Sequence, residues 1–264
     1  MDKIKIVRND IVGVLVDTLQ PIDYVCAAWQ AGAAAFDRVD EWSDIDFYVV
    51  VEDDRVEDTF KVIEQSVETL SEIELKYRLP EPTWHGHSQG LIRLKDTSPF
   101  LFLDIAIMKR SSKDKFLQYK IHNKPLVHFD KIGVAKDDPL DPDTFLKRIQ
   151  SQIEMTKTKF KLFQVLTLKE LNRGNTLTAL SFYMAYTFRP LVEILRTKFC
   201  PQRYNFYTSY LHYDLPDDVA KRLEKLYFVA DPGVLGKCRE EVEEWFWKEV
   251  ETIDFDDVKK KLES

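Results

Sequence analysis

The chain has 264 residues, 44% of them hydrophobic, and a formal net charge of −7 at pH 7. A chain of this length can bury a sizeable core, in one large domain or in two smaller ones. The acidic balance argues against a general nucleic-acid-binding surface, which would be basic, and no apolar run reaches the roughly 18 residues that a membrane span needs.

The cysteines and the first residues indicate a cytoplasmic protein. Cys26, Cys200 and Cys238 are odd in number and far apart, which predicts reduced thiols and not a disulfide framework or a zinc site. The stretch MDKIKIVRND lacks the continuous apolar core of a signal peptide.

The N-terminal half shows a helical pattern followed by several strand patterns. Apolar residues recur at helical spacing over residues 3–19, and Pro21 ends that helix. The acidic residues 52–54 favour the start of a second helix, whose apolar face includes Val56 and Phe60. Strands are expected over residues 24–29, from 44, and over 73–79, 90–94, 98–108 and 126–129, with a hairpin over 90–108. This order predicts a mixed sheet with helices to one side.

Two acidic residues, Asp44 and Asp46, stand at the start of an apolar strand. Residues two apart in a strand point to the same face, so these carboxylates are expected to project side by side. Two ionised carboxylates held together repel each other unless they are protonated or bridged by a cation. The apolar neighbours indicate burial, which makes the charges costly, and metal binding is the common relief.

A third carboxylate, Asp104, is the only charge in the apolar run over residues 98–108. Taken alone, Asp104 fits a metal ligand no better than a lone Asp at a strand edge or a buried Asp whose hydrogen bonds are satisfied. Together with Asp44 and Asp46 it would complete a cradle for two divalent ions about 3.5–4 Å apart, which suits in-line phosphoryl or nucleotidyl transfer. Oxygen-only ligands favour Mg²⁺ or Mn²⁺ over zinc.

This pattern resembles the nucleotidyltransferase superfamily that includes DNA polymerase beta and the aminoglycoside and lincosamide nucleotidyltransferases. Gly32 stands 12 residues before Asp44, the spacing expected of that family's motif. The stretch Ser43–Phe47 reads Ser-Asp-Ile-Asp-Phe and is similar to the motif core Ser-Asp-Ile-Asp-Leu, while Asp104 falls where a third carboxylate belongs. The motif residues span the N-terminal half directly, and the remainder of the chain agrees by architecture alone.

The resemblance implies roles for individual residues. It assigns catalysis and metal binding to Asp44, Asp46 and Asp104, and nucleotide contacts to Gly32, Ala33 and Ser43. Two positions depart from the family pattern. Ala33 replaces the usual Ser, which leaves only a backbone N–H for a phosphate, and Asp37 replaces a second glycine. Both changes predict weaker nucleotide affinity, and neither alters the three carboxylates.

Further candidates lie between the motif segments. Residues 83–89, TWHGHSQ, are either a substrate loop or an ordinary surface loop, and His85 with His87 is weak evidence for a metal. Arg93 is expected on the strand paired with the Asp104 strand, where it would neutralise a phosphate, pair with a carboxylate or face solvent. Arg38 is the one cation that the Gly32 turn offers to a triphosphate.

The Asp- and Pro-rich residues 137–142 predict a domain boundary, with an α/β domain over residues 1–138 and a helical bundle over 139–264. A long helix is expected to end near residue 173, and a second to run over 176–199 with a kink at Pro190. A shorter helix is expected to start near Asp217 and the last one near Pro232. Candidates to contact the nucleotide or acceptor from these helices are Lys157, Lys161, Arg173, Tyr183 and Arg189, although lysines on such a helix more often face solvent.

These observations predict an α+β protein, a mixed-sheet nucleotidyltransferase domain followed by a helical bundle. The expected activity is that of an ATP- or other NTP-binding, magnesium-dependent transferase. It would move a nucleoside monophosphate to a hydroxyl of a small molecule, an antibiotic being one candidate. The alternative is a nucleotide-binding or regulatory module of the same fold with weakened or lost catalysis, since Ala33 and Asp37 differ from the motif.

Overall fold

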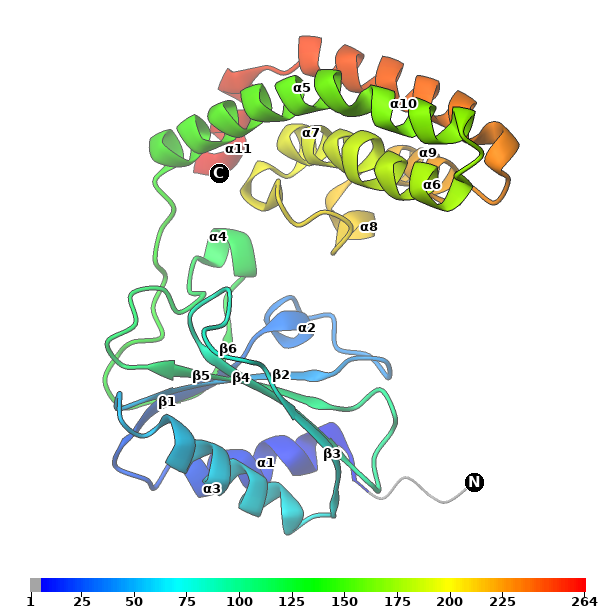
Figure 1. Cartoon of the computed structure of the whole chain (residues 1–264). Helices are drawn as coiled ribbons and strands as arrows, with labels where there is room; N and C mark the ends of the chain where they lie inside the picture. Colours follow the sequence, from blue (N-terminus) through cyan, green and yellow to red (C-terminus); the bar gives the residue numbers. More distant parts are fainter. Residues whose placement is uncertain (1–5) are drawn as a thin grey trace. The chain divides into compact units, whose positions relative to one another are not determined.

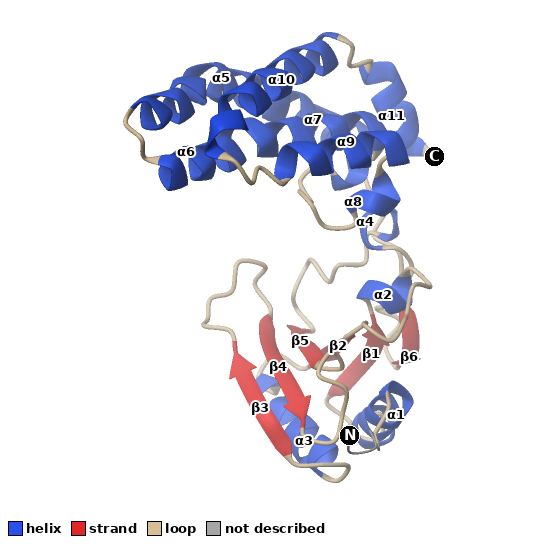
Figure 2. Ribbon diagram, turned by 90° about the vertical axis from the view of Figure 1, so that its right-hand side faces the viewer, coloured by secondary structure: helices blue, strands red, loops and turns tan. Residues whose placement is uncertain are grey.

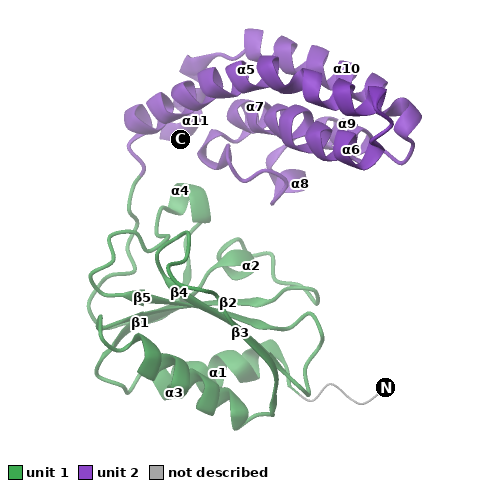
Figure 3. Ribbon diagram, in the orientation of Figure 1, with its two compact units in different colours: residues 1–139 green, residues 140–264 purple. Residues whose placement is uncertain are grey.

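The computed structural model describes residues 6–264 (Figure 1). The chain forms two compact units, residues 1–139 and residues 140–264, and the division falls inside the Asp- and Pro-rich segment (Figure 3). The first unit contains all six strands of the described sheet, and the second is helical. The protein is therefore α+β, as its sequence predicts.

The sheet of the first unit is mixed, with strand order β3-β4-β5-β2-β1-β6. Its central pair, β2 and β5, is parallel, and the other neighbours are antiparallel. The strands are β1 (Val25–Gln30), β2 (Ile45–Val51), β3 (Ile73–Arg78), β4 (Ser88–Leu94), β5 (Leu103–Lys109) and β6 (Leu126–Asp130). Most strand predictions agree with these bounds within two residues, but β5 begins late because residues 98–102 form a turn, in which Leu101 N–H donates to Ser98 O at 3.0 Å.

Helices lie on both sides of this sheet (Figures 1 and 2). The longer ones, α1 (Arg8–Leu19) and α3 (Val56–Glu68), pack on one face, and the single-turn helices α2 (Gly32–Ala35) and α4 (Tyr119–His122) lie on the other side. The expected start of α1 at residue 3 is wrong for residues 6 and 7, which precede the helix, while residues 3–5 lie outside the described part of the chain.

The main core of the first unit lies between the sheet and these two helices. Alternate residues of β2, such as Ile45 and Phe47, point into it and are completely buried. The residues between them face the opposite side, where a smaller core gathers around Trp29, Met108 and Leu117. This alternation decides that Asp46 and Asp104, being out of phase with the main core, lie on the face away from α1 and α3.

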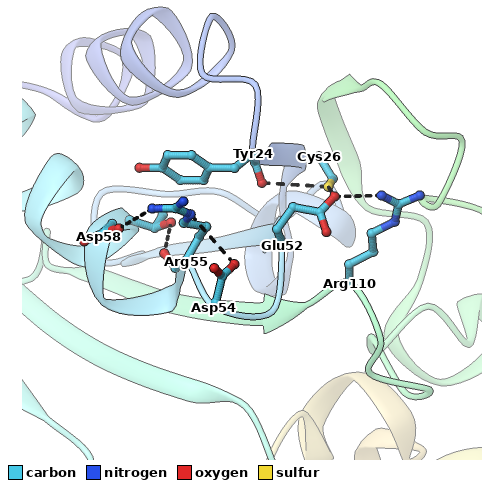
Figure 4. A network of polar contacts seen from close by, with 8 residues as sticks. Tyr24, Cys26, Glu52, Asp54, Arg55, Asp58 and Arg110 are labelled. Carbon is cyan, nitrogen blue, oxygen red and sulfur yellow. Dashed lines mark hydrogen bonds and ion pairs between the residues drawn. The ribbon is translucent and has the colours of Figure 1, made fainter.

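A polar network fastens the other end of β2 (Figure 4). Glu52, directly after the strand, pairs with Arg110 at 2.7 Å, and its Oε1 lies 3.9 Å from the Cys26 Sγ. Burial and the Glu52 charge raise the pKa of the Cys26 thiol. Nearby, Arg55 pairs with Asp58 at 3.0 Å at the start of α3. The pair of Glu52 with Arg110 joins the carboxyl-terminal ends of β2 and β5, the two strands that carry Asp46 and Asp104 at their other ends.

The second unit is built around α5, a helix of 31 residues whose first turn is capped by the Asp141 side chain. Its core holds Phe160 and Phe246, stacked with ring centroids 3.7 Å apart. The helices are α5 (Pro142–Asn172), α6 (Thr176–Tyr183), α7 (Arg189–Phe199), α8 (Leu211–Asp214), α9 (Asp217–Tyr227), α10 (Pro232–Glu251) and α11 (Phe255–Glu263), with a π-helical turn over Met184–Phe188 and a 3-10 turn over Pro201–Arg203.

Two features of this unit differ from the expectation. The helix expected over residues 176–199 is divided into α6 and α7 by the π-helical turn just before Pro190, the position of the expected kink. The helix that starts at Pro232 is not the last, because the Asp254 side chain accepts from the backbone of Asp256 at 2.9 Å and starts α11. No helix within residues 6–264 is long and apolar enough to cross a membrane.

Candidate functional site

Asp46 and Asp104 stand directly opposite each other on the parallel strands β2 and β5. Both side chains are half-buried. Asp44 comes directly before β2 and two residues before Asp46, the spacing at which side chains of a strand share a face. The three predicted carboxylates are therefore brought to one edge of one sheet face. Strand pairing does this, since β5 joins the sheet beside β2 although the two strands are far apart in the sequence.

Gly32 packs directly on the Asp46 carboxylate. A Cβ placed on Gly32 would stand 1.7 Å from the Asp46 Oδ2, and the residue has a φ of +51°, which side chains rarely adopt. The backbone N–H of Ala31 donates to the Asp46 carbonyl at 3.0 Å and holds the turn against the strand. The conformation and the close approach both require glycine here, so the sequence position of Gly32 has a physical reason.

The carboxylates influence one another through their charges. Burial raises the pKa of Asp46 to about 7, and the charges of Asp44 and Asp104 act in the same direction. Burial also raises the pKa of Asp44 and of Asp104. The site therefore stores electrostatic repulsion that either a proton or a cation would relieve.

Arg8 is a site residue that sequence reasoning missed. From the start of α1 its guanidinium donates to the carbonyl oxygens of Ser43, at 3.1 Å, and Asp44. It also donates to Gln30 Oε1 at 3.2 Å, and its positive charge opposes the rise in the pKa of Asp46. Nothing in the sequence marks this arginine, since a cation near a helix start is common on protein surfaces.

Gln89 was missed as well, although it ends the TWHGHSQ segment. Its Nε2 donates to both oxygens of Asp104, at 2.7 and 2.9 Å. Its Oε1 lies 2.9 Å from His85 Nε2, and the backbone N–H of His87 donates to His85 Nδ1 at 3.2 Å. Since Nδ1 accepts, His85 carries its proton on Nε2 and donates to the amide. The segment thus orients Asp104 through Gln89.

The remaining nucleotide-binding candidates of the first unit, which are Ala33, Ser43, Arg38 and Arg93, each have a different set of contacts. Ala33 lies in the first turn of α2, and Ser43 Oγ donates to Asp40 at 2.7 Å, so that this hydroxyl shapes the loop before Asp44. Arg38 lies over the Phe36 ring, 5.0 Å from its centroid. Arg93 is on β4 beside β5, as expected, but its guanidinium pairs with Glu74 at 2.9 Å and not with a motif carboxylate.

Asp37, which replaces a second glycine of the motif, has a left-handed backbone conformation. Its φ is +53°, a left-handed conformation that glycine adopts freely and Asp tolerates better than most residues. Its carboxylate is exposed at the end of α2.

The candidates from the helical half belong to the second unit. Lys157 is half-buried on α5 and pairs with Glu154 at 2.8 Å, while Lys161 is exposed on the same helix. Arg173 pairs with Glu170 at 3.0 Å. The prediction that Tyr183 lines a binding surface is wrong, because this side chain is fully buried and donates to the Leu226 carbonyl at 2.7 Å.

The donor chemistry of the three carboxylates suits a hard divalent cation such as Mg²⁺ or Mn²⁺, because every available ligand atom is oxygen. Their mutual repulsion at a half-buried site agrees with this assignment. Across residues 6–264, no three His, Cys, Asp or Glu side chains are already arranged to hold a metal ion. The carboxylates would therefore have to turn toward a bound ion.

Comparison with known proteins adds no family assignment. No protein-family model matches the chain, and no curated protein is similar to it.

Proposed function

We propose that the protein is a metal-dependent nucleotidyltransferase that moves a nucleoside monophosphate from an NTP to a hydroxyl of a small molecule. The observation that carries this proposal is the register pairing of Asp46 with Asp104, with Gly32 packed on one carboxylate and Asp44 beside it. Acidic residues grouped on a sheet face next to a close backbone turn suit the binding of a cation with a polyphosphate.

In this account each described residue has a defined task. Asp44, Asp46 and Asp104 would hold the divalent ions, which would neutralise charge on the phosphates when bound. Arg8 fixes the loop that carries Asp44, and Gln89 fixes the orientation of Asp104. Asp104 is the carboxylate proposed to take the proton of the attacking hydroxyl. The hydroxyl oxygen then bonds to the α-phosphorus, the bond to the bridging oxygen breaks, and pyrophosphate leaves.

A regulatory or nucleotide-sensing module is the second candidate. Ala33 lacks the hydroxyl that the motif usually carries, and the carboxylates are not arranged in advance around an ion. The first observation favours weaker nucleotide binding and the second favours weaker catalysis, as expected of such a module.

Two measurements separate these candidates. Calorimetric titration with ATP, GTP, CTP and UTP, with Mg²⁺ and again with a chelator, tests nucleotide binding. Transfer of label from α-³²P-labelled NTPs to a panel of hydroxylated acceptors, aminoglycosides and lincosamides included, tests catalysis. The transferase account expects metal-dependent binding and transfer that Asp44→Asn abolishes and Asp53→Asn retains. Binding without transfer to any acceptor favours the sensing module, and full transfer by Asp44→Asn contradicts the metal assignment.

A further inference from the structure

The helical unit contains two adjoining hollows of about 250 and 370 Å³ that share Gln152, Arg189 and Glu193. Their walls come from α5, the π-helical turn, α7 and the segment after the 3-10 turn, all within residues 140–264. Ligand pockets usually measure roughly 300–1,000 Å³, so the larger hollow, of about 370 Å³, is big enough for a small molecule, and the smaller one adjoins it.

Glu193 is a half-buried carboxylate in the wall of both hollows. Burial raises the pKa of Glu193. Hydrogen bonds from the Thr156 hydroxyl, which donates to Oε1 at 2.9 Å, and from the Gln152 side chain oppose that rise. The charges of Arg189 and Lys159 lower that pKa, so both cations are near. Within residues 6–264, however, neither comes within ion-pair distance of Glu193. A carboxylate in a hollow without a direct cation partner favours a ligand that brings one.

Arg189 stands four residues before Glu193 on α7, a spacing at which opposite charges commonly pair. Instead its guanidinium lies over the Tyr207 ring, 5.1 Å from the centroid. A guanidinium group over an aromatic ring can still bind a carboxylate or phosphate through its in-plane N–H groups. One helix thus presents a cation and an anion to the same hollow with space between them.

The π-helical turn beside the hollow forms hydrogen bonds with Gln164 of the neighbouring helix α5. Gln164 Nε2 donates to the Tyr186 carbonyl at 3.0 Å, and the Thr187 hydroxyl donates to Gln164 Oε1 at 2.9 Å. The first of these hydrogen bonds satisfies the Tyr186 carbonyl within the π-helical turn. The turn also places Ala185 and Tyr186 in the wall of the larger hollow. Single π-turns within helices frequently accompany functional sites.

We propose that this hollow binds a small zwitterion of the amino-acid type, with its ammonium group at Glu193 and its carboxylate at Arg189. Lys159 lines the larger hollow and adds a second positive charge to its wall. Gln152 and Tyr204 supply polar groups for the remainder of the ligand. The inference is independent of the carboxylate cluster on the sheet, since every residue involved lies in the helical unit.

The test is calorimetric titration of the full chain, without metal or nucleotide, against the twenty L-amino acids, with acetate and methylamine as half-ligands. We expect at least one amino acid to bind and neither half-ligand to bind at the same concentration. Glu193→Gln and Arg189→Gln should each lower the affinity at least tenfold, whereas Glu154→Gln, an exposed change on α5, should leave it unchanged.

Several outcomes would overturn the inference. They are binding to no amino acid, binding of acetate as tight as that of the amino acid, and unchanged affinity in the two variants. Arg189 is exposed, so Arg189→Gln tests the site even if Glu193→Gln fails to fold, and circular dichroism of each variant establishes which case applies.

Discussion

Asp46 on β2 and Asp104 on β5 are register partners on two parallel strands, and both lie on the sheet face opposite α1 and α3. A half-buried pair of carboxylates at this position costs stability when ionised, because burial raises the pKa of both and the charge of Arg8 only partly opposes the rise at Asp46. Substitutions that remove these carboxylates, or the residues in contact with them, should therefore change the stability of the fold or the titration of the remaining carboxyl groups.

The first prediction concerns pH in the absence of metal. The pKa of Asp46 is raised from 3.8 when unfolded to about 7 when folded, so the folded chain binds more protons across that window. Stability should therefore fall as pH rises from about 4 to 7 and then level, by at most roughly 4 kcal/mol. Asp46→Asn should flatten this part of the urea-derived stability curve.

The matched control for that measurement is Asp53→Asn, at the other end of β2. Hydrogen bonds from Ser111 lower the pKa of this exposed carboxylate. The slope of stability between pH 5 and 7 should remain that of the wild type in this variant. An unchanged slope in Asp46→Asn would show that Asp46 does not titrate there.

The second prediction concerns Gly32. In Gly32→Ala the new methyl group would overlap the Asp46 carboxylate, in addition to the cost of its positive φ. Gly86→Ala is a suitable control, since Gly86 has a φ of +80° and nothing lies within 4 Å of the place that a Cβ would take there. We expect Gly32→Ala to lose about 1–3 kcal/mol more than the control in chemical denaturation. Equal losses would mean that the carboxylate moves aside freely.

The third prediction concerns the hydrogen bonds to Asp104. Gln89→Met keeps the approximate length of the side chain but removes the N–H donor, whose bonds lower the pKa of Asp104. The carboxyl should titrate at a higher pH in ¹³C NMR, since its charged form loses these bonds. Gln65→Met, an exposed change on α3, should leave the titration unchanged. An unaltered Asp104 titration in Gln89→Met would exclude an orienting role for Gln89.

The fourth prediction concerns the helical unit. Asp214 is 1% exposed and accepts from Arg196 at 2.8 Å, and Arg203 also pairs with it at 2.5 Å. Asp214→Asn removes the carboxylate charge that pairs with the fully buried Arg196 and the half-buried Arg203, and should cost about 3–5 kcal/mol. The exposed pair of Arg222 with Glu241 serves as the control, and Glu241→Gln should cost less than about 1 kcal/mol. Similar losses in the two variants would contradict the account of the buried network.

Local pattern accounts for the parts of the fold and site that the sequence predicts. The alternation of Ile45, Asp46 and Phe47 determines which face of β2 each side chain takes, and the stripe from Val56 to Val67 determines the buried side of α3. Helix α5 follows from a cap at Asp141 and a long apolar stripe. Each of these depends on neighbours in the chain.

The missed features depend on long-range contacts. Arg8 reaches the loop at Ser43 from a helix 35 residues earlier, and Gln89 reaches Asp104 because β4 and β5 pair. The sequence contains no sign of either contact, since an isolated Arg or Gln is ordinary on a surface. The π-helical turn likewise needs Gln164 from another helix, so Pro190 alone predicts a kink but not its form.

The most direct test of the central claim is a calorimetric titration of the metal-free chain with Mn²⁺, with and without NTP. The account predicts that the wild type and Asp53→Asn bind with similar affinity. Asp44→Asn, Asp46→Asn and Asp104→Asn should each bind at least about tenfold more weakly. Unchanged Mn²⁺ affinity in these three variants, or no binding by the wild type with any of ATP, GTP, CTP and UTP, would contradict it.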